Sequence, residues 1–171
     1  AGDQVHVVAQ RWEGAPLRVE ERMGGRLIIH RVALDDCLAG PAEAAAERQI
    51  LRSLRSSACP AHTFAWQVSR FAASLARSEG VDLIEAPEWE APLHFFQIRQ
   101  AMAIDSVTPT RCLVHLHSPS ELIFRHNDWD PSLTDYEPLR RSERDSVLAA
   151  DALLCPSRYL ARQAEAMFGL P

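Results

Sequence analysis

Hydrophobic and polar residues follow a strand-like pattern at the start of the chain. Gln4–Ala9 is a short run rich in β-branched residues and predicts a buried strand. Two more β-leaning runs, Val19–Met23 and Leu27–Val32, lie on either side of Gly24-Gly25. Because a glycine pair can form the tight turn between antiparallel strands, these runs predict a β-hairpin.

A helical pattern follows. Ala, Glu, Arg and Leu dominate residues 41–57, and Pro41 suits the first turn of a helix. A second helix is predicted from His62 to Ser78, and Gly80 supplies its stop signal. The apolar residues of this second helix recur at intervals of three and four, which places them on one face. They are Phe64, Val68, Phe71, Ala72 and Leu75.

From residue 81 onward, short apolar strands alternate with helices. The predicted strands cover 81–86, 112–117 and 152–155, and the predicted helices cover 93–102, 120–126, 137–150 and 158–168. This alternation is typical of a parallel sheet covered by helices. The sequence therefore predicts an α/β fold with a doubly wound, mostly parallel, Rossmann-like sheet, helices on both faces and a hairpin near the N-terminus.

The composition fits one globular domain, which we expect to span residues 1–171. The chain has 171 residues, of which 47% are hydrophobic, and its formal net charge is −5. This balance excludes a disordered chain, and the lack of a basic stripe argues against nucleic acid as a partner. No apolar run approaches the roughly 18–20 residues of a membrane span. All 18 basic residues are Arg, which indicates a GC-rich, bacterial genome.

Cysteine and glycine usage exclude several kinds of site. The four cysteines, Cys37, Cys59, Cys112 and Cys155, are too scattered for a disulfide scaffold and form no CxxC pair for zinc. Cys112 and Cys155 lie in apolar runs and are expected to be buried. The chain begins without the basic and apolar segments of a signal peptide, so we expect a cytoplasmic location. Its seven glycines form no GxGxxG pattern and no P-loop.

The carboxyl ends of the predicted strands are where ligands bind in parallel sheets of this kind. His115 and His117 share one face of the second predicted strand, with His117 at its carboxyl end. Because imidazole can accept or donate a proton near neutral pH, His117 is the candidate for proton transfer or substrate orientation. The alternative is a structural histidine that hydrogen-bonds a neighbouring loop.

A metal site is a second interpretation of the same histidines. His115, His117 and Glu121 have the HxH-x3-E spacing found in cupin metal sites, where three ligands bind one ion. Further donors follow at His126, Asp128 and Asp130. Pro109 stands where that motif has a glycine, and long helices contradict an all-β barrel. This hypothesis therefore ranks below a site for an organic substrate.

An acidic and aromatic segment follows the strand at 81–86. Glu88 could accept hydrogen bonds from substrate hydroxyls, and Trp89 could pack against a sugar face. The alternative is a solvated loop with Trp89 folded onto the core. Further along, the charged residues of 137–145, Glu143 among them, predict a solvated helix face with local ion pairs. Ser157 predicts a helix N-cap.

Three segments at the predicted strand ends carry a family resemblance. They are Asp82–Glu88, Leu113–Ser120 and Ala150–Ser157, and Gly169-Leu170-Pro171 follows them at the end of the chain. Their order and spacing resemble the N-terminal, acceptor-side domain of GT-B glycosyltransferases of the family 4-like group (group 1). The final tripeptide is similar to the exit toward the interdomain linker of that family.

The resemblance implies transfer of a sugar from a nucleotide-diphosphate sugar to an acceptor hydroxyl, usually with retention at the anomeric carbon. It implies no cofactor and no metal. His117 matches the histidine of the family's LH-S/T-P motif, so it is expected to face the transferred sugar as the catalytic residue. The expected substrate-binding residues are Glu88, Trp89, Ser118 and Ser120.

The chain departs from the family pattern at both ends. The first strand with its glycine-rich donor loop is missing, and so is the C-terminal domain with its paired glutamates. We therefore expect a segment that is incomplete at its N-terminus and shows no transfer alone, because one wall of the cleft is gone. The donor sugar, the acceptor, the oligomeric state and a peripheral membrane contact stay open.

Two other functions remain as alternatives. The first is a non-catalytic α/β module that binds a ligand or a partner at the same strand ends, since the sequence contains no complete catalytic set. The second is a metal-dependent enzyme that uses His115, His117 and Glu121.

Overall fold

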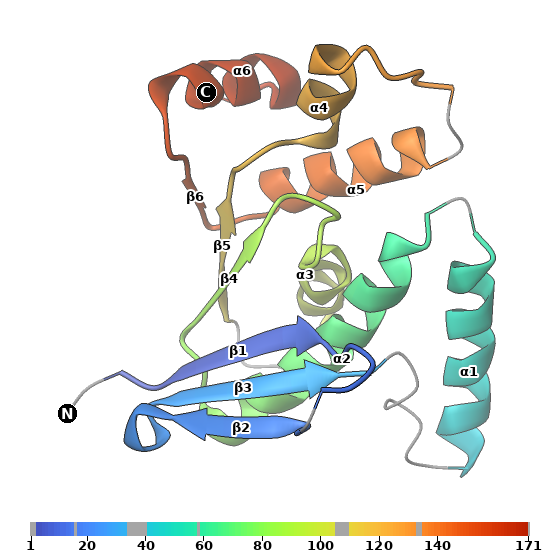
Figure 1. The fold of residues 1–171 in the computed structure, drawn as a ribbon, viewed down its shortest axis with the longest axis vertical. Helices are drawn as coiled ribbons and strands as arrows, with labels where there is room; N and C mark the ends of the chain where they lie inside the picture. The colour runs from blue at the N-terminus through green and yellow to red at the C-terminus, as the bar shows by residue number, and fades with distance from the viewer. Residues whose placement is uncertain are drawn as a thin grey trace. The chain divides into compact units, whose positions relative to one another are not determined.

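The chain divides into two compact units, residues 1–50 and 51–171, with the boundary inside helix α1 (Pro41–Arg55). The computed structural model describes residues 3–15, 17–33, 41–57, 59–104, 110–132 and 135–170, without the side chains of 41–44. Figure 1 shows the elements of both units. Of the residues singled out above, Cys37, Pro109 and Pro171 lie outside the described ranges.

The first unit contains a small mixed sheet. Its strands are β1 (Val5–Gln10), β2 (Val19–Arg22) and β3 (Leu27–Val32), and the short 3-10 turn η1 (Met23–Gly25) joins the last two. β3 lies in the centre, parallel to β1 and antiparallel to β2. The predicted hairpin is confirmed. Gly24 and Gly25 have φ angles of 66° and 83°, a region that glycine reaches without steric cost.

The second unit contains a three-stranded parallel sheet. Its strands are β4 (Leu83–Pro87), β5 (Arg111–His115) and β6 (Ala152–Leu154), in the order β4-β5-β6. Pro87, His115 and Leu154 are register partners across the sheet, so all three strands end at one edge. The loops that follow the strands therefore emerge side by side.

Helices alternate with these strands as the sequence predicts. They are α2 (Ala61–Glu79), α3 (His94–Ala101), α4 (Ser120–His126), α5 (Tyr136–Leu148) and α6 (Arg158–Phe168). The predicted stop at Gly80 is confirmed: its φ is 67°, and its N–H donates to the Ala76 carbonyl at 3.1 Å. Figure 1 shows α3 and α5 on one side of the sheet, with α4 and α6 beyond the ends of β5 and β6.

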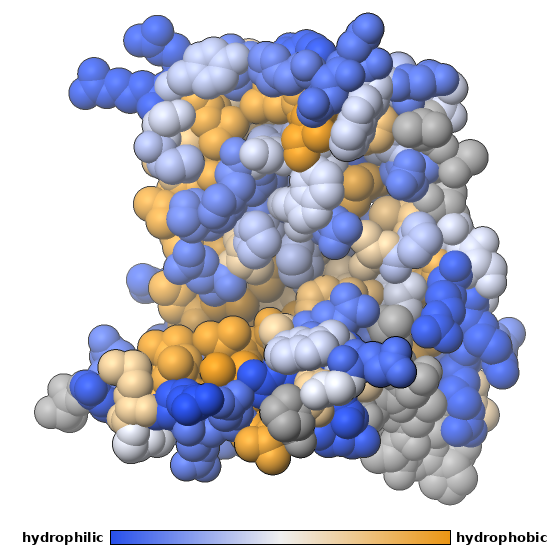
Figure 2. Space-filling view, viewed as in Figure 1, coloured by the Kyte–Doolittle hydropathy of each residue, from blue (hydrophilic) through white to orange (hydrophobic). Residues whose placement is uncertain are grey.

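The core of the second unit forms on one face of its sheet. Alternate residues of β4 and β5 point into it, because side chains alternate along a strand. These residues are Ile84, Ala86, Cys112 and Val114, and the helices add Ala72, Ala73, Phe96, Val147, Leu160, Ala164 and Phe168. On the other face, Leu83 and Leu154 are 51% and 45% exposed. Figure 2 shows hydrophobic residues reaching the surface over β6.

The predicted fold class is confirmed, with a parallel sheet flanked by helices and a small mixed sheet at the N-terminus. The strands form two three-stranded sheets. β5 ends two residues earlier than predicted, so His117 lies in the bend after it. Cys112 is buried as expected, whereas Cys155 is partly exposed. Within the described ranges, no helix combines the length and the apolar character needed to cross a membrane.

Candidate functional site

The loops after β4 and β5 meet at the carboxyl edge of the parallel sheet. Pro87 and His115 are neighbours in register, and the backbone N–H of Glu88 donates to the His115 carbonyl at 3.4 Å. This contact brings residues that are far apart in the sequence to one place. In open parallel sheets, that edge is the usual position of a ligand site.

His117 presents an imidazole to solvent at this edge, with its side chain 53% exposed. Its Nδ1 lies 2.9 Å from the backbone oxygen of His115. Because a carbonyl oxygen can only accept, Nδ1 carries a proton, and in the neutral ring Nε2 is therefore the acceptor. The rings of His115 and His117 lie close together, with centroids 4.1 Å apart. The free nitrogen can accept a hydrogen bond from a substrate hydroxyl.

Carboxylates surround the two histidines. The Nδ1 of His115 donates to Glu85 Oε1 at 3.1 Å, and Glu85 is half exposed. The Nδ1 of His117 lies 3.9 Å from Glu88 Oε2. This side of the site is therefore negative, which disfavours a nearby anion and suits a neutral, hydroxyl-bearing molecule.

Glu88 occupies a different place from the one the sequence suggests. Instead of facing a substrate hydroxyl, its side chain is fully buried. Both carboxylate oxygens accept the backbone N–H of His117 at 2.8 Å, and Oε1 also accepts the backbone N–H of Ser118. A buried carboxylate stays charged only when hydrogen bonds replace the lost water. Glu88 thus holds the loop that carries His117.

The two candidate serines have different surroundings. Ser118 is exposed, so its hydroxyl can reach a ligand. Ser120 is fully buried at the start of α4, where its Oγ donates to Glu143 Oε1 at 2.6 Å and its backbone N–H donates to Oε2 at 2.8 Å. The structure therefore gives Ser120 a protein partner in place of a substrate.

Glu143 is the residue that the sequence pattern misassigns. It does not belong to a solvated face but is 1% exposed, and its Oε1 also accepts the backbone N–H of Glu90 at 3.3 Å. Burial raises the pKa of this carboxyl group to about 7, although the hydrogen bonds from Ser120 and Glu90 oppose the shift. The sequence spacing could have indicated this burial. Leu139 and Val147 lie four residues on either side of Glu143, on the same helix face, and both are buried.

The loop after β4 contains a strained turn. Glu90 and Ala91 have φ angles of 60° and 45°, in the left-handed region that non-glycine residues seldom occupy. The N–H of Ala91 donates to the Glu88 carbonyl at 2.8 Å, and Ala91 is fully buried. Trp89 lies in the middle of this turn and is partly exposed. Its ring is therefore accessible to a ligand at the same edge.

The metal interpretation finds no support among the described residues, because no three His, Cys, Asp or Glu side chains converge there. Glu121 instead faces Arg140, whose Nη1 lies 3.5 Å from its Oε2. His115 and His117 contact Glu85 and the backbone, as described above.

The remaining predictions concern a helix cap and ion pairs within one helix. The N-cap at Ser157 is confirmed, because its Oγ accepts the backbone N–H of Leu160 at 3.1 Å. The ion pairs predicted on α5 are also present: Glu137 contacts Arg140 at 3.3 Å and Arg141 at 3.4 Å.

A second histidine pair was not anticipated from the sequence. His62 and His94 stack with ring centroids 6.1 Å apart, and His62 Nε2 lies 3.0 Å from the Oγ of Ser142. Ser142 itself donates to backbone carbonyls of its own helix, so His62 supplies the proton of this bond. Burial lowers the pKa of both histidines. They act as neutral structural groups within the helical layer.

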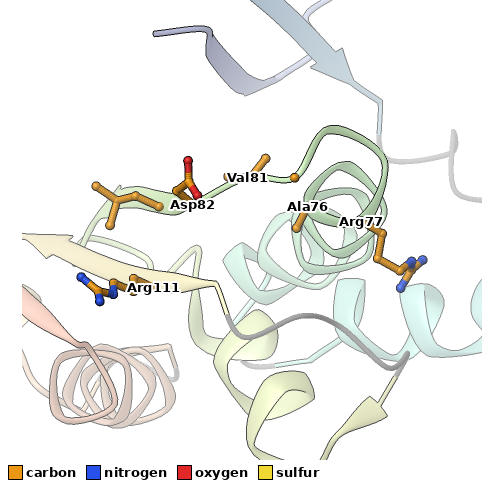
Figure 3. A pocket seen from close by; sticks show the side chains of 7 residues that line it. Ala76, Arg77, Val81, Asp82 and Arg111 are labelled. Atoms are coloured by element: carbon orange, nitrogen blue, oxygen red, sulfur yellow. The ribbon is translucent and has the colours of Figure 1, made fainter.

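A hollow of about 550 Å³ lies at the opposite edge of the sheet. Its lining includes Arg77 and Asp82 from the end of α2 and the start of β4, and Arg111 from the start of β5. Figure 3 shows the two arginine side chains extending away from one another. The hollow therefore lacks the converging polar groups that are typical of a ligand-binding site.

Comparison with known proteins identifies the family of the chain. The family model described as Glycosyltransferase Family 4 matches residues 1–171. No curated protein matches the chain.

Proposed function

The chain belongs to glycosyltransferase family 4, and from this premise we propose that it shapes the acceptor side of the reaction cleft, with His117 contacting the transferred sugar. The reaction is transfer of a sugar from a nucleotide-diphosphate donor to an acceptor hydroxyl, with retention at the anomeric carbon. It uses no cofactor and no metal. Neither the donor sugar nor the acceptor is specified further.

The geometry of His117 is the observation that carries this proposal. Its Nδ1–H is held by the His115 carbonyl at 2.9 Å, which leaves Nε2 as an acceptor at an exposed position. An imidazole fixed in one tautomer can accept a hydrogen bond from a sugar hydroxyl and thereby orient the sugar for transfer.

The charge around the histidines supports an acceptor-side role. Glu85 and Glu88 lie beside His115 and His117, and negative groups disfavour a diphosphate in direct contact with them. The sequence also contains no GxGxxG pattern and no P-loop that could cradle phosphates. We place the donor diphosphate away from this edge, and we expect residues 1–171 alone to show no transfer.

Two further groups, one partly exposed and one exposed, complete the proposed contact surface. Trp89 can pack its ring against the apolar face of a sugar, and the hydroxyl of Ser118 can donate to or accept from a substrate hydroxyl.

The thiols of Cys59, Cys112 and Cys155 are free, which supports a reducing, cytoplasmic location.

Replacement of His117 tests the proposal directly. The assay uses a protein in which residues 1–171 are joined to a donor-binding domain. A panel of UDP-, GDP- and ADP-sugars is offered with simple polyol acceptors, and release of nucleoside diphosphate is measured. His117→Ala should lower kcat about 100-fold, a typical loss for a group that orients or exchanges protons with a substrate. The thermal midpoint should stay within about 2 °C, because the side chain is exposed.

His126→Ala is the matched control, since His126 is an exposed histidine at the end of α4. It should leave kcat unchanged. Equal turnover of His117→Ala and the parent enzyme would reduce His117 to a structural residue. If no nucleotide sugar supported turnover of the parent that carries a donor-binding domain, a non-catalytic binding module would become the better interpretation.

A further inference from the structure

Glu143 is a buried acid that the proposed reaction does not use. It projects from α5 with 1% of its surface exposed and accepts three hydrogen bonds. Two come from Ser120, at the first turn of α4, and one comes from the backbone of Glu90, in the loop after β4. One carboxylate thus connects three segments that are distant in the sequence.

The Glu90 contact falls on the most strained part of the site. Glu90 and its neighbour Ala91 both have positive φ angles, and surrounding contacts must over-determine such a conformation for it to persist. Glu143 Oε1 receives the Glu90 N–H at 3.3 Å, and the Ala91 N–H closes the turn onto the Glu88 carbonyl at 2.8 Å. Glu143 therefore helps to hold the turn that begins with Glu88.

Glu88 in turn holds His117. Its oxygens accept the backbone N–H groups of His117 and Ser118, as described above. Contacts therefore run from Glu143 through the strained turn to Glu88 and from there to His117. A second route runs from Glu143 to Ser120, which begins α4 three residues after His117.

We propose that Glu143 is a positioning residue that fixes the loops after β4 and β5 against α5 and thereby sets the position of His117. It does not contact substrate. The claim about loop position is independent of the proposed reaction, whereas any effect on turnover rests on the proposed function.

Protonation offers a way to perturb this contact without mutation. Burial raises the pKa of Glu143 to about 7, and Glu88 adds a smaller repulsive contribution from the loop after β4. Tyr136 lies on the same helix, and its pKa is raised mainly by burial and to a smaller extent by the charge of Glu143. From α4, Ser120 faces the carboxyl group of Glu143. A protonated carboxyl group has lost its charge and donates from one oxygen, so it accepts more weakly from the three N–H and O–H donors. The longest bond, from Glu90, is the first expected to weaken.

Nuclear magnetic resonance of the ¹⁵N-labelled protein tests the loop position without any substrate. The amide signals of Glu90 and Ser120 should shift with a midpoint near pH 7, and Glu143→Gln should abolish this titration. In the same variant, hydrogen exchange at the His117 and Ser118 amides should become at least about tenfold faster, because the loop opens more often.

Glu137→Gln is the matched control. Glu137 lies on the same helix but is half exposed and paired with Arg140, so its replacement should leave these amides unchanged. Should Glu143→Gln fail to fold, Ser120→Ala removes one of the three donors and keeps the charge. It should then raise exchange at His117 and Ser118 in the same direction.

Unchanged exchange at His117 and Ser118 in the folded variant would overturn the positioning role. Turnover of the protein that carries a donor-binding domain gives a separate readout. Glu143→Gln should lower kcat about tenfold and leave KM within about twofold, and the pH profile of kcat should lose its inflection near 7. Faster exchange with unchanged kcat would uphold the role of Glu143 in holding the loop and overturn its effect on turnover, whereas His117→Ala tests the catalytic role of His117 separately.

Discussion

Glu88 and His117 are joined by two hydrogen bonds across 29 residues of sequence: each carboxylate oxygen lies 2.8 Å from the His117 backbone nitrogen. The bond leaves the imidazole free, since it uses only the backbone of His117. A buried acid therefore fixes the chain while the side chain stays available at the carboxyl edge of the sheet. This arrangement separates positioning from chemistry within one loop.

Replacing Glu88 should destabilise the protein even when shape is kept. In Glu88→Gln, one carboxylate oxygen becomes an NH₂ group that faces the N–H donors of His117 and Ser118. Leaving a buried donor without an acceptor costs about 1–3 kcal/mol, so the free energy of unfolding in urea should fall by that amount. Glu85→Gln is the control, because Glu85 is half exposed, and it should change stability by less than about 0.5 kcal/mol. Equal stabilities of the two variants would contradict the role of Glu88.

Glu143 should make the protein less stable in mild alkali than in mild acid. Its pKa is raised in the folded state, from 4.5 to about 7, so its favourable contribution is complete below pH 4.5 and is lost as pH rises through 7. The loss amounts to at most about 3 kcal/mol. Urea unfolding of the parent and of Glu143→Gln at pH 5 and pH 8 isolates this effect. The free energy of unfolding of the parent, relative to that of Glu143→Gln, should be lower at pH 8 than at pH 5. A difference between the two proteins that does not depend on pH would contradict the burial effect.

His62 and His94 should make the protein less stable as the pH falls, which is opposite to the effect of Glu143. Burial lowers the pKa of both in the folded state, so their contribution is present above about pH 6.5 and is lost as pH falls through their folded values. His94→Gln should therefore reduce the loss of stability between pH 7 and pH 5. His126→Gln, at an exposed histidine, should keep the slope of the parent. Chemical denaturation at closely spaced pH values measures both slopes.

Ser157 should contribute measurably to the stability of α6. Its Oγ caps the backbone N–H of Leu160 at 3.1 Å, and Ser157→Ala should lower the free energy of unfolding by about 1 kcal/mol. Ser78→Ala is a suitable comparison, because Ser78 is an exposed serine near the end of α2. A loss no larger than that of Ser78→Ala would show that the cap is replaced by water.

The sequence predicted the elements of this fold well because their causes are local. Apolar residues at intervals of three and four predict α2, and glycine at the end of a helix or between strands needs no distant partner. The candidate His117 also follows from local order, since it lies at the carboxyl end of a predicted apolar strand. Its prediction as the catalytic residue remains a prediction that the kinetic test above must decide.

The surroundings of the site depended on tertiary structure. Glu88 and Glu143 look like ordinary charged residues in a loop and on a helix, and charge alone favours an exposed position for both. Their partners lie 23 to 53 residues away and are mostly backbone N–H groups, which leave no periodic trace in the sequence.

The sequence by itself therefore determined which segments are strands and helices and that two histidines lie where β5 ends, but it placed this end at His117 instead of His115. Only the folded chain decided that two carboxylates are buried and hold the loops, because packing brings donors from separate segments together and hydrogen bonds then compensate for the lost hydration.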